Sequence, residues 1–349
     1  MIDSATKKSK NLEIYFQPFR KNIVGIDDYF ESPYGRKKII YADWTASGRL
    51  YRPIEEKILN EMGPYVANTH TETSITGSVM THAYHDARDI IKKHVKASSN
   101  DVLITVGTGM TGAINKFQRI LGLKLCENLK DNTQIPEEKR PVIFVSHMEH
   151  HSNQTSWLET IARVEVIPSN NEGLPCLIKL EELINNYKEV PIKIAAITGC
   201  SNVTGIRTNY HEVAKVMHQN NGLCFVDFAC SAPYVDIDMH PTNTKQKLDA
   251  IFFSPHKFLG GPGSSGVLIF NRSLYKNKVP DHPGGGTVTW TNPWGAHSFF
   301  NNIEVREDGG TPGFLQCIKT ALAIQLKEAM GVDNIIKREA EITTYVMTE

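Results

Sequence analysis

The chain has 349 residues, with 38 Lys or Arg against 38 Asp or Glu, so its formal net charge at pH 7 is +0. This balance excludes a bulk electrostatic attraction to nucleic acid or to an anionic membrane. No apolar run approaches the roughly 20 residues that span a bilayer, and the start, MIDSATKKSKNLEIYF, lacks the apolar core of a secretory signal. The sequence therefore predicts a soluble, cytoplasmic protein without a membrane or nucleic-acid partner.

The six cysteines are spread along the chain without a Cys-x-x-Cys pair. Zinc sites commonly contain such pairs, and disulfide frameworks belong to short secreted chains. We therefore expect reduced thiols and no metal site. The cysteines are Cys126, Cys176, Cys200, Cys224, Cys230 and Cys317.

In chain order, residues 1–38 are polar and lysine-rich, which predicts an N-terminal arm with little core of its own. From about Val102 onward, continuous apolar runs alternate with amphipathic stretches, a pattern typical of an α/β fold with a mostly parallel sheet. The last two apolar runs are too close for an intervening helix, so one of them is expected to run antiparallel. We expect strands at 102–106, 142–146, 164–168, 194–198, 223–227, 250–253 and 266–270, and helices at 110–121, 151–163, 178–188 and 209–219.

A stretch rich in Gly, Pro and Asn follows residue 271, and a long helix is expected at 313–330. The remaining residues keep a helical pattern to the end of the sequence, without a Gly or Pro stop signal. In parallel sheets ligands gather at the carboxyl ends of the strands. The polar clusters that follow the predicted strands are therefore the candidate functional residues.

The segment GTGMTG, residues 107–112, follows one strand and opens a helix. Glycines there let a phosphate approach the backbone, and the N–H groups of a helix N-terminus bind it. The same letters fit the G-x-G-x-x-G pattern of a dinucleotide-binding oxidoreductase. That alternative needs a second strand ending in an acid about 20 residues on, whereas this chain continues with a polar loop. A phosphate cradle remains the favoured interpretation.

Lys257 follows the strand at 250–253 in the segment Ser254-Pro-His256-Lys257, ahead of a Gly-rich turn. A lysine at a strand end beside potential phosphate donors suits a Schiff-base lysine. The alternative is an ordinary surface lysine in a turn. Asp227 ends another strand, where a carboxylate can keep the ring nitrogen of pyridoxal phosphate protonated. The alternative interpretation is that Asp227 caps the N-terminus of a helix.

His150 and His151 follow a third strand, in SHMEHHSNQTSW. An imidazole there can stack on a cofactor ring or move protons. A metal is the alternative, but the pair lacks the i, i+4 spacing of a zinc-binding helix. Asn202 follows a fourth strand and can donate to a cofactor oxygen or a substrate carboxylate. Ordinary turn chemistry is its alternative.

In sequence order the clusters are a phosphate cradle, a ring stacker, an amide donor, a carboxylate and a lysine. That order, with these local sequences, resembles the class V aminotransferase family, the fold-type I pyridoxal-phosphate enzymes that include cysteine desulfurases and selenocysteine lyases. The resemblance covers about residues 39–330. It implies a three-layer αβα fold with a mostly parallel seven-stranded sheet, as a large cofactor domain at 39–330. Residues 331–349 would begin a C-terminal small domain that is truncated. The motifs that carry it are Ser254-Pro-His256-Lys257, Val226-Asp227-x-Ala229, Met148-Glu149-His150-His151 and Ser201-Asn202-x-x-Gly205.

The resemblance also implies residue roles. Lys257 would form the internal aldimine and act as the base, and Asp227 would pair with the pyridine nitrogen. His150 would stack on the ring, Ala229 would pack on its opposite face, and Asn202 would lie near the phenolic oxygen and the substrate carboxylate. The phosphate would be bound by Gly109, Met110, Thr111, Ser254 and His256.

Two further segments take their roles from the family. The loop from Gly284 to Thr287 would reach the phosphate of a neighbouring subunit, which implies a homodimer with shared active sites. Asn68-x-His70 resembles an active-site loop near the entrance.

The chain also departs from the family. Cys230 stands where desulfurases usually have a glutamine, and a thiol there loses a strong hydrogen bond to the cofactor. The persulfide cysteine and the carboxylate-binding arginine of desulfurases lie in the small domain, and this sequence ends at Glu349 before that region is complete. The chain is therefore either a fragment or has a reduced small domain.

The function implied is that of a pyridoxal 5'-phosphate-dependent transferase or lyase that acts on an amino acid through an external aldimine. A desulfurase or selenocysteine lyase would also have a sulfur-acceptor protein as partner, and an aminotransferase is the second enzymatic interpretation. The alternative from another class is a catalytically degenerate cofactor-binding protein, or a fragment without the substrate residues of the small domain.

Overall fold

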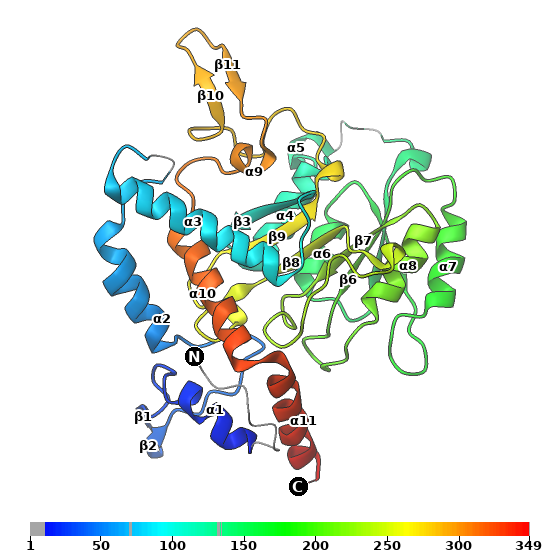
Figure 1. Cartoon of the computed structure of the whole chain (residues 1–349). Coiled ribbons are helices and arrows are strands. Elements are labelled where there is room, and N and C mark those ends of the chain that lie inside the picture. Colours follow the sequence, from blue (N-terminus) through cyan, green and yellow to red (C-terminus); the bar gives the residue numbers. More distant parts are fainter. Residues whose placement is uncertain (1–10, 70–71, 131–132, 134, 349) are drawn as a thin grey trace.

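The computed structural model describes residues 11–69, 72–130, 133 and 135–348 (Figure 1). Its centre is a seven-stranded sheet in the order β3-β9-β8-β7-β6-β4-β5. Only β9 runs antiparallel to its neighbours in this sheet, which confirms the expectation for one of the last two strands. The strands are β3 (Asp101–Val106), β4 (Val142–Ser146), β5 (Arg163–Ile167), β6 (Lys193–Thr198), β7 (Leu223–Asp227), β8 (Ala250–Phe253) and β9 (Gly266–Asn271).

Helices cover both faces of the sheet, which makes the three layers of the predicted αβα fold (Figure 1). On one face α4 (Gly109–Ile120) and α6 (His151–Leu158) pack on the strands. The opposite face carries α3 (Ile75–His94), α7 (Leu177–Asn186), α8 (Tyr210–Gln219) and α10 (Phe314–Met330).

Successive residues of each central strand enter the two apolar layers in turn. In β7, Phe225 belongs to the layer under α4, whereas Cys224 and Val226 belong to the other layer. The Phe117 ring of α4 lies 5.2 Å from that of Phe225 and 4.8 Å from that of Phe270, between ring centroids. A sheet buried on both faces explains why its strands read as continuous apolar runs.

Several helices differ from the sequence-based expectation, and two of them show why. Helix α6 ends at Leu158, five residues before the predicted 163, because the Thr160 hydroxyl donates to the Trp157 carbonyl at 2.7 Å and accepts from Ala162 N–H at 3.2 Å. The sequence analysis missed α3 altogether. Its buried side chains, Met80, Tyr84, Ala87 and Ile91, follow helical spacing, but polar and histidine residues separate them.

The ends of the described chain lie together below the sheet (Figure 1). Helix α1 (Leu12–Arg20) lies beside α11 (Val332–Thr348), and Tyr15 donates its hydroxyl proton to the Met330 carbonyl at 3.0 Å. Arg338 of α11 also pairs with Glu13 of α1. The N-terminal segment is therefore docked on the protein. Helix α2 is Arg52–Lys57, and the short helices α5 and α9 are Glu127–Lys130 and Ile303–Arg306.

Two hairpins stand apart from the central sheet. One is formed by β1 (Tyr29–Ser32) and β2 (Gly35–Lys38), and the other by β10 (Val288–Thr291) and β11 (His297–Phe299). The second hairpin projects away from the body of the molecule (Figure 1). None of the helices in the described part of the chain combines the length and apolar character of a membrane-spanning segment.

Candidate active site

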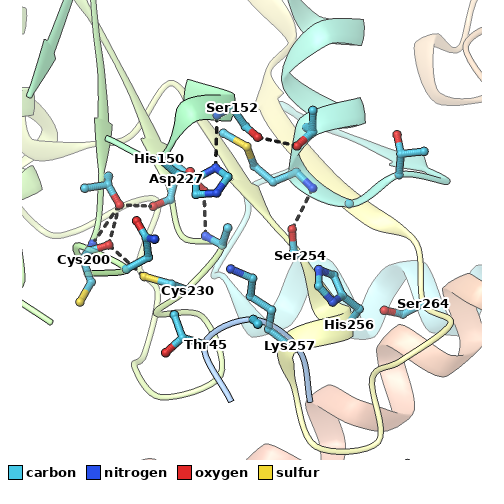
Figure 2. Close-up of a pocket in the computed structure, with 18 of the residues that line it drawn as sticks. Thr45, His150, Ser152, Cys200, Asp227, Cys230, Ser254, His256, Lys257 and Ser264 are labelled. Atoms are coloured by element: carbon cyan, nitrogen blue, oxygen red, sulfur yellow. Dashed lines mark hydrogen bonds between the residues drawn. The ribbon is translucent and has the colours of Figure 1, made fainter. Parts of the chain in front are cut away.

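A cavity of about 700 Å³ opens at the carboxyl ends of the parallel strands (Figure 2). The five polar clusters picked out in the sequence meet there, because parallel strands deliver their following loops to one edge of the sheet. All the predicted site residues line this cavity except Thr287. Those that do are Gly109, Met110, Thr111, His150, Asn202, Asp227, Ala229, Ser254, His256 and Lys257.

The N-terminus of α4 forms one end of the cavity. Its N-cap, Thr108, makes no side-chain hydrogen bond to the first turn, and Gly109 adopts a φ of +60°. The Met110 N–H donates to the Ser254 hydroxyl at 2.8 Å, while Thr111 and Ser152 share a hydroxyl contact of 2.6 Å. Amide N–H groups and hydroxyls at an uncapped helix N-terminus make an anion-binding surface.

The close packing of Gly109 on Gly266 of β9 sets the position of that helix end. A Cβ on Gly266 would lie 2.1 Å from the Gly109 carbonyl oxygen, which no backbone can accommodate without shifting. This neighbour across the cavity wall is 157 positions away in the sequence, so local patterns gave no sign of it.

We expect Gly266→Ala to push α4 away from the sheet and to lower the free energy of unfolding by about 1–3 kcal/mol, the range for overpacking. Urea denaturation measures the loss. The matched control is Gly63→Ala, because a Cβ there would meet only the Ile58 carbonyl oxygen at 3.6 Å. Equal stability of the two variants would contradict the packing argument.

Asp227 is buried at the end of β7, only 3 % exposed. Its Oδ1 accepts a hydrogen bond from the Ala229 N–H at 2.8 Å. Burial raises the pKa of Asp227 to about 6, against the opposing effects of this N–H and of the Lys257 charge. A buried carboxylate facing a cavity is held there to pair with a cation or a donor.

Lys257 ends the short turn after β8, and Figure 2 shows its amine pointing into the cavity from the side opposite His150. His150 is the N-cap of α6, and its Nδ1 accepts from the Ser152 N–H at 3.2 Å. This bond assigns any proton on neutral His150 to Nε2. Burial and the nearby charge of Lys257 lower the pKa values of both His150 and His256, which favours their neutral forms.

Glu149 has a structural place beneath His150. Its carboxylate accepts from the Thr198 N–H at 2.9 Å, from the Asn153 amide at 2.6 Å and from the Ser146 hydroxyl at 2.5 Å. It thereby ties the ends of β4 and β6 to α6. Burial raises the pKa of Glu149 to about 7 despite these donors.

Asn202 and Ala229 lie on the two loops that follow β6 and β7. Asn202 is exposed in a tight turn, where the Ser201 hydroxyl accepts from the N–H groups of Val203 and Thr204 at 3.2 Å each. This turn chemistry and a place on the cavity wall occur together, so the two interpretations of Asn202 are compatible.

Thr287 lies away from this cavity. Its side chain is fully buried, and its hydroxyl donates to the Gly284 carbonyl at 2.6 Å, which closes the loop that precedes β10. Residues 284–286 are exposed. Asn68 is described, but His70 of the predicted entrance loop lies outside the described residues.

Sequence reasoning missed one wall of the cavity, the segment Asp43–Ala46, which lies beside Lys257 (Figure 2). Its neighbour Gly48 donates its N–H to the His256 carbonyl at 2.8 Å, and the Ser47 hydroxyl lies 3.3 Å from His256 Nδ1. No local sequence motif predicts such a long-range contact. Cys200 and Ser264 were also missed, and both line the cavity.

The comparison with known families decides the classification. The family description "Aminotransferase class-V" matches residues 40–349. This chain belongs to the class V aminotransferase family. The match covers most of the chain and extends the resemblance found in the sequence, which ended near residue 330.

Relatives within the family are cysteine desulfurases by name. The class V chain is 30 % identical to a probable cysteine desulfurase of Staphylococcus epidermidis, over 90 % of this chain and 72 % of that protein. It is 28 % identical to another of Halalkalibacterium halodurans, over 88 % and 71 %. Within the class V family, this chain is therefore similar to cysteine desulfurases.

Solved structures confirm the fold of this class V protein. The cysteine desulfurase of Thermococcus onnurineus superposes with a TM-score of 0.71 at 22 % identity, covering 93 % of this chain and 75 % of that one. An Escherichia coli cysteine desulfurase superposes with a TM-score of 0.67 at 23 % identity, covering 91 % and 72 %. The fold-type I prediction is thus confirmed.

Proposed function

We propose that this chain binds pyridoxal phosphate in the cavity of Figure 2 and acts on an amino acid, with cysteine desulfuration or selenocysteine cleavage as the favoured reaction. One observation carries the proposal: an amine, a buried carboxylate and an uncapped helix N-terminus line one cavity, at Lys257, Asp227 and Gly109–Thr111. Names of the relatives favour cysteine as the substrate.

The residues of the cavity fit this cofactor. The Ser264 hydroxyl is buried without a hydrogen-bond partner among the described residues, so a ligand oxygen would satisfy it. A Cβ on Gly107 would meet nothing within 4 Å, which leaves room for a phosphate beside the α4 N-terminus. Gly109, Met110, Thr111, Ser254 and His256 would hold the phosphate, and Asp227 would hold the ring nitrogen.

Pyridoxal phosphate supplies an aldehyde that condenses with amines and a ring that withdraws electrons from the neighbouring carbon. Lys257 would offer the amine that holds the cofactor, and its Nζ would take and return the proton on the α-carbon of the substrate. The neutral imidazole of His150 and the side chain of Ala229 would contact the cofactor ring. Asn202 would donate to the substrate carboxylate or the phenolic oxygen.

We also propose the assembly and setting that the family resemblance implies. The exposed loop at residues 284–286 would approach the cavity of a second copy in a homodimer. A desulfurase of this kind would pass its sulfur to an acceptor protein in the cytoplasm. An arm at 1–38, a large domain at 39–330 and the beginning of a small domain at 331–349 remain the proposed division.

An absorption spectrum of the purified chain tests the function. We expect added pyridoxal phosphate to produce a yellow band that borohydride removes. Cysteine should shift that band and, with a dithiol present as reductant, yield alanine and sulfide. Alanine, serine and aspartate serve as matched amino acids. No band after addition of the cofactor would contradict the proposal. A band that no amino acid shifts would support the alternative, a cofactor-binding protein without catalysis.

A further inference from the structure

Two cysteines lie next to each other on the cavity wall, at Cys200 and Cys230 on the loops after β6 and β7 (Figure 2). The Cys230 thiol donates a hydrogen bond to the Cys200 carbonyl at 2.9 Å, whereas the Cys200 thiol donates to the Gly205 carbonyl at 3.3 Å. Cys200 lies two residues beyond Thr198, and Cys230 lies three beyond Asp227, its partner in the β6–β7 register. The pair is therefore set by the sheet itself.

Both thiols are accessible from the cavity. Cys200 and Cys230 are each partly exposed and line it, whereas Cys224 of β7 is fully buried. The backbone around the pair is held in place, because the Gly199 N–H donates to the Asp227 carbonyl at 2.8 Å and the Thr198 hydroxyl donates to the Cys200 carbonyl at 2.7 Å. A small reagent that enters the cavity therefore meets two neighbouring cysteines.

The two thiols differ in acidity. The neighbouring Cys230 thiol and the positive charge of Arg207 lower the pKa of Cys200, although burial opposes them. The neighbouring Cys200 thiol and burial raise the pKa of Cys230. A more acidic thiol beside a thiol that keeps its proton is the arrangement of an attacking and a resolving cysteine in thiol–disulfide exchange.

We propose that Cys200 and Cys230 form a redox modification site, which closes to an intramolecular disulfide by exchange with a small-molecule disulfide. The Cys200 thiolate attacks one sulfur of the reagent and releases one thiol, leaving a mixed disulfide on Cys200. Cys230 then loses its proton and attacks the Cys200 sulfur, releasing the second thiol. Two protein thiols are oxidised and one reagent disulfide is reduced, so the exchange balances.

Contact between the two residues supports the second step. The Cys230 sulfur lies 2.9 Å from the Cys200 carbonyl oxygen, and rotation about the Cα–Cβ bond of Cys200 would release its thiol from the Gly205 carbonyl and turn it toward Cys230. The inference goes beyond the proposed function and does not rest on it, since it concerns the chain's own thiols in the absence of pyridoxal phosphate.

The experiment treats the reduced, cofactor-free chain with oxidised glutathione and maps its thiols by mass spectrometry. Trypsin cuts at Arg207 and Lys215, and chymotrypsin cuts at Phe225 and Phe228, which separates Cys230 from Cys224. We expect a cross-linked peptide that joins Cys200 to Cys230, lighter by two hydrogens than its reduced parts. Reduction with a dithiol should restore both thiols.

Three variants sharpen the result. Cys200→Ser and Cys230→Ser should each lose the cross-link, and Cys230→Ser should keep a glutathione adduct on Cys200. The matched control, Cys176→Ser, should keep the cross-link, because Cys176 lies outside the cavity and is also partly exposed. Cys126 is exposed and reports that the reagent is active. Wild-type protein with Cys126 modified but Cys200 and Cys230 free, or carrying separate adducts, would overturn the proposal.

Discussion

Replacing Lys257 with alanine is expected to abolish the adduct that borohydride traps between the protein and pyridoxal phosphate. The amine of Lys257 points into the cavity, and an alanine offers nothing to condense with the aldehyde. Turnover should fall by at least about 10²–10⁴-fold, the usual contribution of a positioned acid or base. Peptide mapping of the reduced protein measures the adduct directly.

The matched control for this prediction is Lys179→Ala. Lys179 lies exposed on α7, paired with Glu182, and does not line the cavity. It should leave both the adduct and the spectrum unchanged. A trapped adduct that persists in Lys257→Ala would move the assignment to another lysine, even if turnover were lost.

Asp227→Asn is expected to weaken binding of pyridoxal phosphate by about 10- to 100-fold, because a charge-assisted hydrogen bond contributes about 1.5–3 kcal/mol. The variant keeps the size of the side chain and its acceptor for the Ala229 N–H. It loses only the negative charge that would pair with a protonated ring nitrogen. Titration followed by the visible absorption band gives both affinities.

The pH dependence of the same pair of proteins separates charge from shape. The pKa of Asp227 is about 6 in the cofactor-free protein, so the wild type should bind more weakly as pH falls through that value. The phosphate group titrates in the same range, so the informative quantity is the ratio of wild-type to variant affinity at each pH. That ratio should approach one below about pH 6. A constant ratio would show that the carboxylate acts only through packing.

Asp227 should also make the free energy of unfolding depend on pH. Its folded-state pKa of about 6 lies above the ordinary 3.8, so the folded protein holds this proton more tightly than the unfolded chain. The resulting stabilisation is complete below pH 3.8 and is lost as pH rises through about 6. The free energy of unfolding of Asp227→Asn should lack this component of the pH dependence.

The sequence predicted the parts of the fold that depend on local pattern. Strands buried on both faces, such as β4 and β7, read as apolar runs because their apolar residues pack alternately on the two helix layers. The polar clusters that follow these strands contain most of the residues that line the cavity. Helix α3 was not predicted because polar residues of its exposed face separate its buried residues in the sequence.

What the sequence could not predict depends on contacts between distant segments. The Asp43–Ala46 wall and the approach of Gly109 to Gly266 exist only once the chain is folded. Sequence analysis named Glu149 within the family motif and assigned it no role, whereas it holds two strand ends and α6 through its hydrogen bonds. The neighbourhood of Cys200 and Cys230 likewise follows from the register of β6 on β7.

The contact between the wall segment and the lysine turn has a consequence for how the protein matures. The Ser47 hydroxyl lies 3.3 Å from the His256 carbonyl, across 209 positions of sequence, and the Gly260 N–H donates to the Arg49 carbonyl at 2.8 Å. During synthesis the N-terminal segment therefore emerges long before the surface on which it docks. Non-local contacts of this kind form late in folding. Lys257 is thus enclosed only after the sheet has been assembled, and a nascent chain has no closed cavity until then.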